Sequence, residues 1–280
     1  MNQSRRPRPY EPQYNSFRLN CHDQTNMRLT PNTTVVVLEA MSITRETGLR
    51  PLLSPALRNG AVRAMCERRL REVFWRGLPV YAALALAMLA GGWWLLGIAS
   101  TRYGAADAVP EIAHYALALG LGQASALVYA TARLTPAAYL DVTHRHASRE
   151  WAALTAMNMD APALVCTPWL IAGTVTAAGY WALYYTLYLA VEKCFPIMLS
   201  WLGVPFVPIV SGAFASLATL AITLPCALAG GFVAAWVTLL LASRERFTSV
   251  RRNSALGLRA YLIALGTGAL AQGLMYAILR

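Results

Sequence analysis

The sequence predicts an all-α integral membrane protein, and three observations lead to this fold class. First, 57% of its 280 residues are hydrophobic and only 13% are charged, a balance typical of chains with several membrane spans. Second, long stretches carry no charged residue, and a helix needs about 20 apolar residues to cross the hydrocarbon core. Third, the basic residues gather in alternate connections between these stretches, as the positive-inside rule requires.

Residues 1–59 form a basic arm in front of the apolar part of the chain. Its arginines are interspersed with prolines, namely Pro7, Pro9, Pro12, Pro31, Pro51 and Pro55. We therefore expect little regular structure in this arm. The arginine-rich start, with no acidic residue before Glu11, resembles an organelle targeting sequence. The alternative is a retained arm that packs on a partner or on lipid headgroups.

Residues 60–77 have the pattern of an amphipathic helix that lies at the membrane surface. The apolar face consists of Val62, Met65, Cys66, Leu70, Val73 and Phe74. The opposite face consists of Arg63, Glu67, Arg68, Arg69, Arg71 and Glu72. This separation predicts an interfacial helix that leads into the first span. An ordinary basic segment next to the membrane is the alternative.

Residues 78–280 form the predicted membrane domain, with five spans. The expected spans are 77–101, 112–132, 161–191, 213–241 and 256–279. Residues 195–212 are apolar as well, but Pro205 and Pro208 interrupt them. We interpret 195–212 as an interfacial or re-entrant piece, because proline removes a helical hydrogen bond.

Charge distribution sets the orientation and excludes several classes of function. Of the 24 Lys and Arg residues, 13 lie in residues 1–76, so the N-terminus is expected inside and the C-terminus outside. The net charge of +11 then reflects topology and attraction to anionic headgroups rather than nucleic-acid binding. The span centres carry no charge, which disfavours a proton pump. We find no ATP-binding loop and no metal-spaced Cys/His set, and expect no enzymatic activity, catalytic residue, metal or cofactor.

Several short motifs share their spacing with one known family. Arg76–Pro79 reads R-G-L-P, Arg102–Ala105 reads R-Y-G-A, and Ala153–Asp160 reads A-L-T-A-M-N-M-D. Between them, Arg133 and Asp141 stand where that family has an arginine and a glutamate. From Leu78 to Gly173 the chain resembles the MlaE-type permeases, the membrane subunits of bacterial and plastid lipid-transport ABC systems.

The resemblance implies a fold, partners and an activity. It implies a five-span permease preceded by an elbow helix, which forms a homodimer with a lipid path between the subunits. A separate ATPase and an MCE-type lipid carrier would be its partners, together with membrane lipids, and a bound phospholipid would be its only ligand. We expect phospholipid transport between membranes, with the chain in a mitochondrial or plastid inner membrane rather than a bacterial one.

The stretch from Arg149 to Pro162 matches the coupling helix of that family, which docks on the ATPase from the inner side. Trp151, Leu154 and Met157 recur at helical spacing and form an apolar stripe that a partner could receive. The resemblance implies an interface made of Arg149, Glu150, Trp151, Leu154, Met157 and Asp160. The alternative is a connector whose stripe packs on the protein's own loops.

Two further groups of residues are candidates for function. Arg133 and Asp141 lie about two helical turns apart, so we expect them to interact at the inner end of the second span; Arg133 could instead meet lipid phosphate. On the third span, one helical face carries Trp181, Tyr184, Tyr185 and Tyr188. This face is either an aromatic belt or packing surface, or the wall of a lipid site.

The sequence departs from the family at its charged positions. Leu119–Gln123 reads L-G-L-G-Q where the family has a charged segment, and Glu150 is the only acid left in Arg149–Ala153. Charges inside a membrane are costly and are usually kept when they act. A second function therefore stays open: a permease-like scaffold without transport, serving as a structural subunit of a large organellar complex such as a respiratory-chain or ATP synthase assembly.

Overall fold

The computed structural model describes residues 60–103, 112–159, 161–201, 217–244 and 250–279. The predicted basic arm 1–59 and Asp160 lie outside the described residues. The described part belongs to one unit of the chain, Ala40–Arg280. It is almost entirely helical and contains no strand. The predicted all-α fold class is confirmed for this part of the chain.

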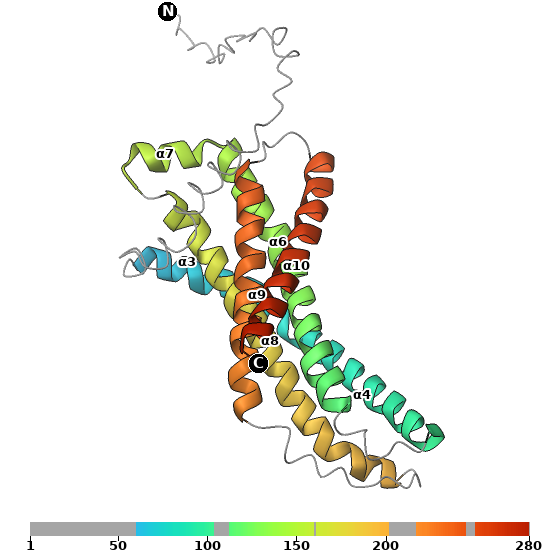
Figure 1. Cartoon of the computed structure of the whole chain (residues 1–280). Helices are drawn as coiled ribbons and strands as arrows, with labels where there is room; N and C mark the ends of the chain where they lie inside the picture. Colours follow the sequence, from blue (N-terminus) through green and yellow to red (C-terminus); the bar gives the residue numbers. More distant parts are fainter. Residues whose placement is uncertain (1–59, 104–111, 160, 202–216, 245–249, 280) are drawn as a thin grey trace, which may run out of the picture. The chain divides into compact units, whose positions relative to one another are not determined.

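Figure 1 shows the helices in the order in which they follow one another along the chain. The segment predicted to be amphipathic comes first, made of α3 (Gly60–Leu70) and the π-helical turn η2 (Arg71–Trp75). The long helices that follow are α4 (Leu78–Tyr103), α6 (Gly122–Ala147) with its π-helical start η4 (Ala113–Leu121), α8 (Ala161–Trp201), α9 (Leu217–Arg244) and α10 (Val250–Leu279). Between α6 and α8 stands the short helix α7 (Glu150–Ala156).

Four helical stretches in the described part are long and apolar enough to cross a membrane. They are Gly60–Ala99, Tyr115–Ala147, Thr219–Ser243 and Ala255–Leu279. The protein is therefore membrane-embedded, as its composition predicts. The 41-residue helix α8 is not one of these four. The first stretch also joins the amphipathic segment and α4 into one run, because η2 bends the chain there without ending the helix.

Aromatic side chains of α8 form the centre of the packing. Trp181, Tyr184 and Tyr188 are fully buried against α4 and α6, and Trp93 of α4 stacks on Tyr188 at 6.3 Å. Glycine allows this approach: a Cβ on Gly122 of α6 would lie 2.6 Å from the Tyr184 ring. The large rings of α8 thus fill the space that small residues of α6 leave open.

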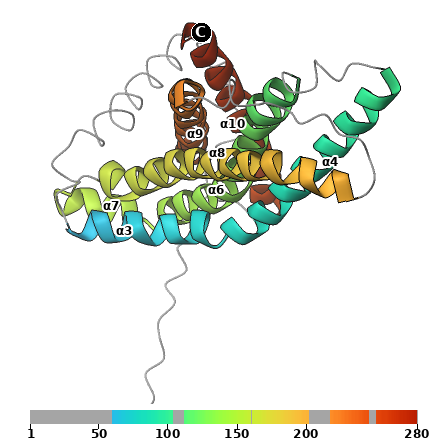
Figure 2. The same cartoon turned by 90° about the horizontal axis from the view of Figure 1, so that it is seen from below.

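A second cluster of buried residues joins α6, α8, α9 and α10. Its largest buried side chains are those of Trp169 and Tyr139, followed by Leu134, Leu170 and Leu239. The backbones approach closely where glycines meet, since a Cβ on Gly268 of α10 would lie 2.9 Å from the carbonyl oxygen of Gly230 on α9. Figure 2 shows α9 and α10 on the side of α8 and α6 opposite to α3.

Three predicted boundaries are wrong in the same way. The helix predicted to end at residue 191 runs to Trp201, so at least Phe195–Trp201 is part of α8 and not a separate piece. The helix predicted over 112–132 runs to Ala147, and α10 begins at Val250 rather than 256. Charged residues end an apolar run but not a helix, because Glu, Lys and Arg are good helix formers.

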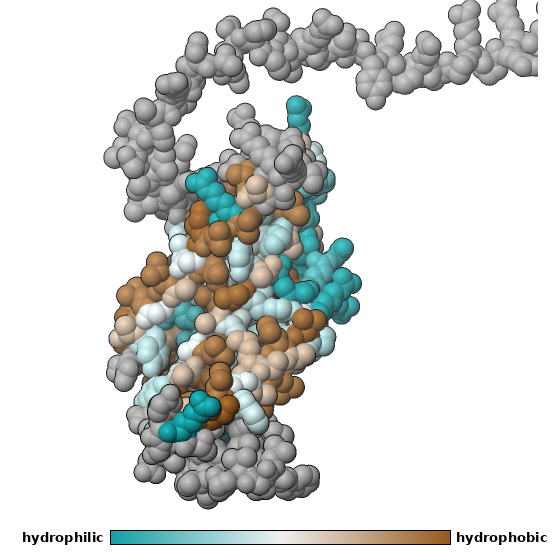
Figure 3. Space-filling model, turned by 90° about the vertical axis from the view of Figure 1, so that its right-hand side faces the viewer, coloured by the Kyte–Doolittle hydropathy of each residue, from teal (hydrophilic) through white to brown (hydrophobic). Residues whose placement is uncertain are grey.

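The outer faces of α4 and α10 are apolar and open. In the membrane-crossing windows of these two helices only 17% of the residues are buried. The exposed apolar side chains are Val80, Leu84, Leu86, Trp94, Leu95 and Ile98 on α4 and Leu258, Leu262, Ile263, Leu270, Leu274 and Ile278 on α10. Hydrophobic residues predominate in the middle of the face shown in Figure 3. Such faces suit contact with lipid tails.

Candidate functional site

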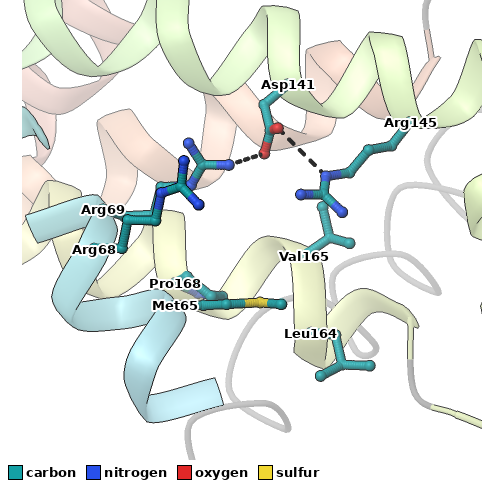
Figure 4. A pocket seen from close by; sticks show the side chains of 8 residues that line it. All are labelled: Met65, Arg68, Arg69, Asp141, Arg145, Leu164, Val165 and Pro168. Carbon is teal, nitrogen blue, oxygen red and sulfur yellow. Dashed lines mark hydrogen bonds and ion pairs between the residues drawn. The ribbon is translucent and has the colours of Figure 1, made fainter. Parts of the chain in front are cut away.

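The carboxylate of Asp141, on α6, joins three helices (Figure 4). Its Oδ2 accepts a hydrogen bond from Arg69 Nη2 of α3 at 2.8 Å and another from Trp169 Nε1 of α8 at 2.9 Å. Its Oδ1 accepts from Arg145 Nε, one turn further along α6, at 3.3 Å. The side chains of Arg69, Asp141 and Arg145 are only 20–23% exposed. This Asp141 cluster is thus a partly buried network of charge-assisted bonds, which are stronger than bonds between neutral groups.

Arg69 occupies a position that its place in the sequence does not suggest. It was expected on the polar, solvent-facing side of the amphipathic helix. Instead, its guanidinium lies 4.4 Å above the ring of Trp169, and Nη1 donates to Glu72 Oε2 at 3.0 Å. A guanidinium stacked on an indole adds a cation–π attraction of about 0.5–2 kcal/mol. The polar face of α3 therefore carries the contact that attaches this helix to the bundle.

The carbonyl oxygens of the η2 turn accept hydrogen bonds from side chains of the bundle. Arg133 donates from Nε to the Val73 oxygen at 3.2 Å and from Nη2 to the Glu72 oxygen at 3.3 Å. Tyr180 of α8 donates from Oη to the Val73 oxygen at 2.9 Å. Four residues after Val73, the oxygen of Gly77 accepts a hydrogen bond from Tyr129 Oη at 3.2 Å. The bend between α3 and α4 is thus held by donors from α6 and α8.

Among the described residues, no direct hydrogen bond or ion pair joins Arg133 to Asp141, and the two residues belong to separate networks. Arg133 binds the backbone of η2, and Asp141 binds Arg69, Arg145 and Trp169. Both residues nevertheless serve the same purpose, which is to attach residues 60–77 to α6. Sequence spacing along α6 does not reveal the segment 60–77 packed beside it, which supplies partners to both residues.

The predicted stripe on α7 divides into an inward and an outward part. Trp151 stacks on His146 with ring centroids 4.5 Å apart, and both Trp151 and Leu154 pack against the buried cluster of α6, α8 and α9. Met157, in contrast, is 59% exposed. The alternative of a self-packed connector therefore holds for Trp151 and Leu154. The short α7 turns these two residues inward because α8 begins directly beside it.

The ends of α7 are fixed by residues in the left-handed backbone region. Arg149 before the helix has φ 58° and Asn158 after it has φ 57°. After Asn158, Met159 N–H donates to the Leu154 oxygen at 3.0 Å, which is the bond of a Schellman cap. Asparagine adopts this conformation readily, whereas arginine pays a cost of about 1 kcal/mol. Glu150 accepts from Arg145 Nη1 at 3.2 Å and so links α7 to the Asp141 cluster.

The aromatic face of the third predicted span lies inside the protein. Trp181, Tyr184, Tyr185 and Tyr188 are each at most 3% exposed. They face α4 and α6, and Trp181 stacks on Tyr185 at 5.4 Å. These four side chains thus pack within the chain, and a role of this face in binding lipid stays a prediction. They pack inward because α4 and α6 offer small residues opposite them.

Four residues of the site were missed by sequence reasoning: Arg69, Trp169, Tyr129 and Tyr180. Trp169 and Tyr180 lie within a charge-free run, where an aromatic residue looks like ordinary packing. The available signal was their polar atoms, because buried indole N–H and phenol O–H groups usually need a partner. Sequence alone could not tell which carbonyl or carboxylate that partner would be.

The fold and the site define a helical membrane protein whose first segment is attached by polar bonds. Comparison of the chain with family models and with curated proteins found no match.

Proposed function

We propose that this chain is the membrane subunit of a phospholipid transporter of the MlaE permease type. In this proposal α3 and η2 are the elbow, and α4, η4 with α6, α8, α9 and α10 are five spans, with α8 as the central one. An amphipathic segment that bends into the first long helix supports this layout. The motif spacing along residues 78–173 points in the same direction.

The exposed end of α7 is the observation that carries the proposal. Met157 and Met159, just after α7, are 59% and 49% exposed. Arg149 and Glu150, at the start of this seven-residue helix, are exposed as well. Exposed apolar side chains on a short segment that also carries charge are typical of an interaction site. Arg149 is also held in a backbone conformation that arginine rarely adopts, and such outliers gather where function requires them. We propose that this end of α7 docks on the separate ATPase from the inner side.

Further features of the proposal concern partners and place. A homodimer would cover the open apolar faces of α4 or α10, with a lipid path between the two copies. An MCE-type carrier would act on the outer side. The arginine-rich start of the chain favours the inner membrane of a mitochondrion or plastid.

The alternative function, a permease-like scaffold without transport, has an observation in its favour. The charges of the Asp141 cluster are paired within the chain, and Trp151 and Leu154 pack inward. Charged groups that are already paired with one another within the chain are not free to form new ion pairs when an ATPase binds. In that case the exposed end of α7 would hold a neighbouring subunit of a larger complex.

Co-purification from native membranes in mild detergent distinguishes the two functions. A transporter should bring along an ATPase and an MCE-type protein, and Met157→Glu should remove the ATPase while leaving the melting temperature of the chain unchanged. Ala152→Glu, also on an exposed position of α7, serves as the control for added charge. Recovery of a large assembly without any ATPase would support the scaffold and contradict transport.

A further inference from the structure

A pocket lies between α3, the last turns of α6 and the first turns of α8 (Figure 4). Its volume is about 90 Å³, and roughly 10–15 Å³ suffices for one water molecule. It can therefore hold a group of several heavy atoms. Its lining consists of Met65, Arg68, Arg69, Asp141, Arg145, Leu164, Val165 and Pro168.

The lining has two chemical halves. Three guanidinium groups and one carboxylate occupy the polar half, and the other half is apolar, with Met65 and Pro168 facing Leu164 and Val165. Glu72 and Glu150 bind the arginines from outside the lining. These carboxylates fix the guanidinium groups in place and, with Asp141, balance their charge, so what the pocket offers to an anion is the guanidinium donors that line it.

The arginines keep hydrogen-bond donors available. A guanidinium can donate from all three of its nitrogens. Arg68 uses only Nε, toward Glu72, and Arg145 uses Nε and Nη1, toward Asp141 and Glu150. Within the described part of the chain, both terminal nitrogens of Arg68 and Nη2 of Arg145 have no protein acceptor. Forked donors of this kind match the oxygens of a phosphate group.

The position of the pocket matches the depth of lipid headgroups. Asp141 lies less than two turns, roughly 9 Å, before Ala147 at the end of α6. Headgroup layers occupy about 5–8 Å at each surface of a bilayer. This end of α6 also carries His144, Arg145 and His146, as is typical of the inner side. A lipid here would place its phosphate on the arginines and its chains along the apolar half.

We propose that this pocket binds the phosphate group of an anionic membrane lipid, with Arg68 and Arg145 as its principal ligands. The bound lipid would hold α3 against α6 and α8. The proposal does not depend on transport, since the site would serve a transporter and a scaffold equally. The Asp141 cluster already joins α3 to α6. A lipid bound beside it adds a second link between these two helices and so stabilises the bend between α3 and α4.

The test uses the full-length protein in a mild non-ionic detergent, titrated with dioleoyl phosphatidylglycerol in mixed micelles. Native mass spectrometry measures the bound lipid, and a thermal melt measures its effect. Arg68→Gln should weaken apparent lipid affinity about tenfold, the effect expected for one lost charge-assisted bond pair. Arg63→Gln is the matched control. Both side chains are 78% exposed and donate from Nε to a glutamate four residues on, but Arg63 lies outside the pocket.

The proposal expects a loss of lipid affinity in Arg68→Gln that Arg63→Gln does not show, and any other outcome overturns it. Equal losses in Arg68→Gln and Arg63→Gln would show that general surface charge attracts the lipid. Unchanged binding in Arg68→Gln would remove the pocket as the site.

Two further ligands separate the contributions of the phosphate group and of the lipid chains to the affinity. Dioleoylglycerol, which has no phosphate, should not raise the melting temperature. Equal stabilisation by inorganic phosphate alone would replace the lipid by a free anion.

Discussion

Arg69 and Asp141 are 72 positions apart in the chain and form an ion pair of 2.8 Å between α3 and α6. Without it, α3 would be attached to the bundle mainly through Val62, its one deeply buried residue, and through Val73 of the following η2. Because Trp169 donates to the same carboxylate oxygen, the pair also includes α8. Three helices are thus joined at one carboxylate.

We expect Arg69→Gln and Asp141→Asn to be strongly coupled in stability. In Asp141→Asn, two arginines and one indole N–H lose the carboxylate that they share. Arg69 then keeps only Glu72 and Arg145 only Glu150 as an ionic partner, and weakening a partly buried network of charges is costly. Each single change should cost about 1–3 kcal/mol of unfolding free energy, and the double change should cost at least 1 kcal/mol less than the sum. Melts in detergent measure all four variants.

Arg63→Gln and Glu67→Gln provide the control cycle for that pair. Arg63 and Glu67 form an arginine–carboxylate ion pair on α3, as Arg69 and Asp141 do between α3 and α6. The side chains of Arg63 and Glu67, however, are 78% and 66% exposed. Exposed pairs contribute little, so the coupling should stay below about 0.5 kcal/mol. Strict additivity in both cycles would show that the Asp141 cluster does not attach α3.

Tyr180→Phe should destabilise the protein by about 1–2 kcal/mol, because the Val73 carbonyl of η2 loses a buried donor. Tyr184→Phe is the control, one turn further along α8. It is as deeply buried as Tyr180, but its hydroxyl has no partner among the described residues. Its removal should change stability by less than about 0.5 kcal/mol. Equal costs for the two variants would contradict the role given to the Tyr180 hydroxyl.

Gly77→Ala should disrupt the bend between η2 and α4. A Cβ at this position would overlap Tyr180 Oη and lie 2.8 Å from Arg133 Cδ, so both donors to η2 would have to move. We expect a loss of about 2 kcal/mol or more, comparable to other overpacking changes. Gly91→Ala, within α4 and with nothing near the added Cβ, should be neutral or stabilising by up to about 1 kcal/mol. A neutral Gly77→Ala would show that the bend adapts freely.

Trp151→Ala should lower the melting temperature of the isolated chain. The side chain stacks on His146 and packs against the buried cluster, so its loss should cost about 2–4 kcal/mol. Met157→Ala, at an exposed position, should leave the melting temperature unchanged. An unaltered melt in Trp151→Ala would restore the interpretation in which this residue anchors a partner.

The proposed orientation predicts opposite labelling of two exposed positions. In a cysteine-free variant, a cysteine replacing Asn158 next to α7 should react with an impermeant reagent only from the inner side. A cysteine replacing Arg102 near the end of α4 should react only from the outer side. The basic residues at the α7 end determine this direction. Labelling of both positions from one side would contradict the topology.

The sequence by itself determined the helical membrane fold. Apolar run length and charge placement suffice for this, because in a bilayer the backbone must satisfy its own hydrogen bonds and only a few structures do so. The helical character of residues 60–75 and the presence of a short helix after residue 149 were also predictable from periodicity.

Tertiary structure alone decided which residues meet. Arg69 lies on the polar face of its own helix, yet its partners Asp141 and Trp169 come from α6 and α8. Trp151 and the four aromatic residues of α8 had two interpretations each, and their burial was decided by the small residues of α6 and the start of α8. Periodicity gives the face of a helix but not the neighbour of that face. The neighbour depends on packing between segments far apart in the chain, and that information is not contained in any local pattern.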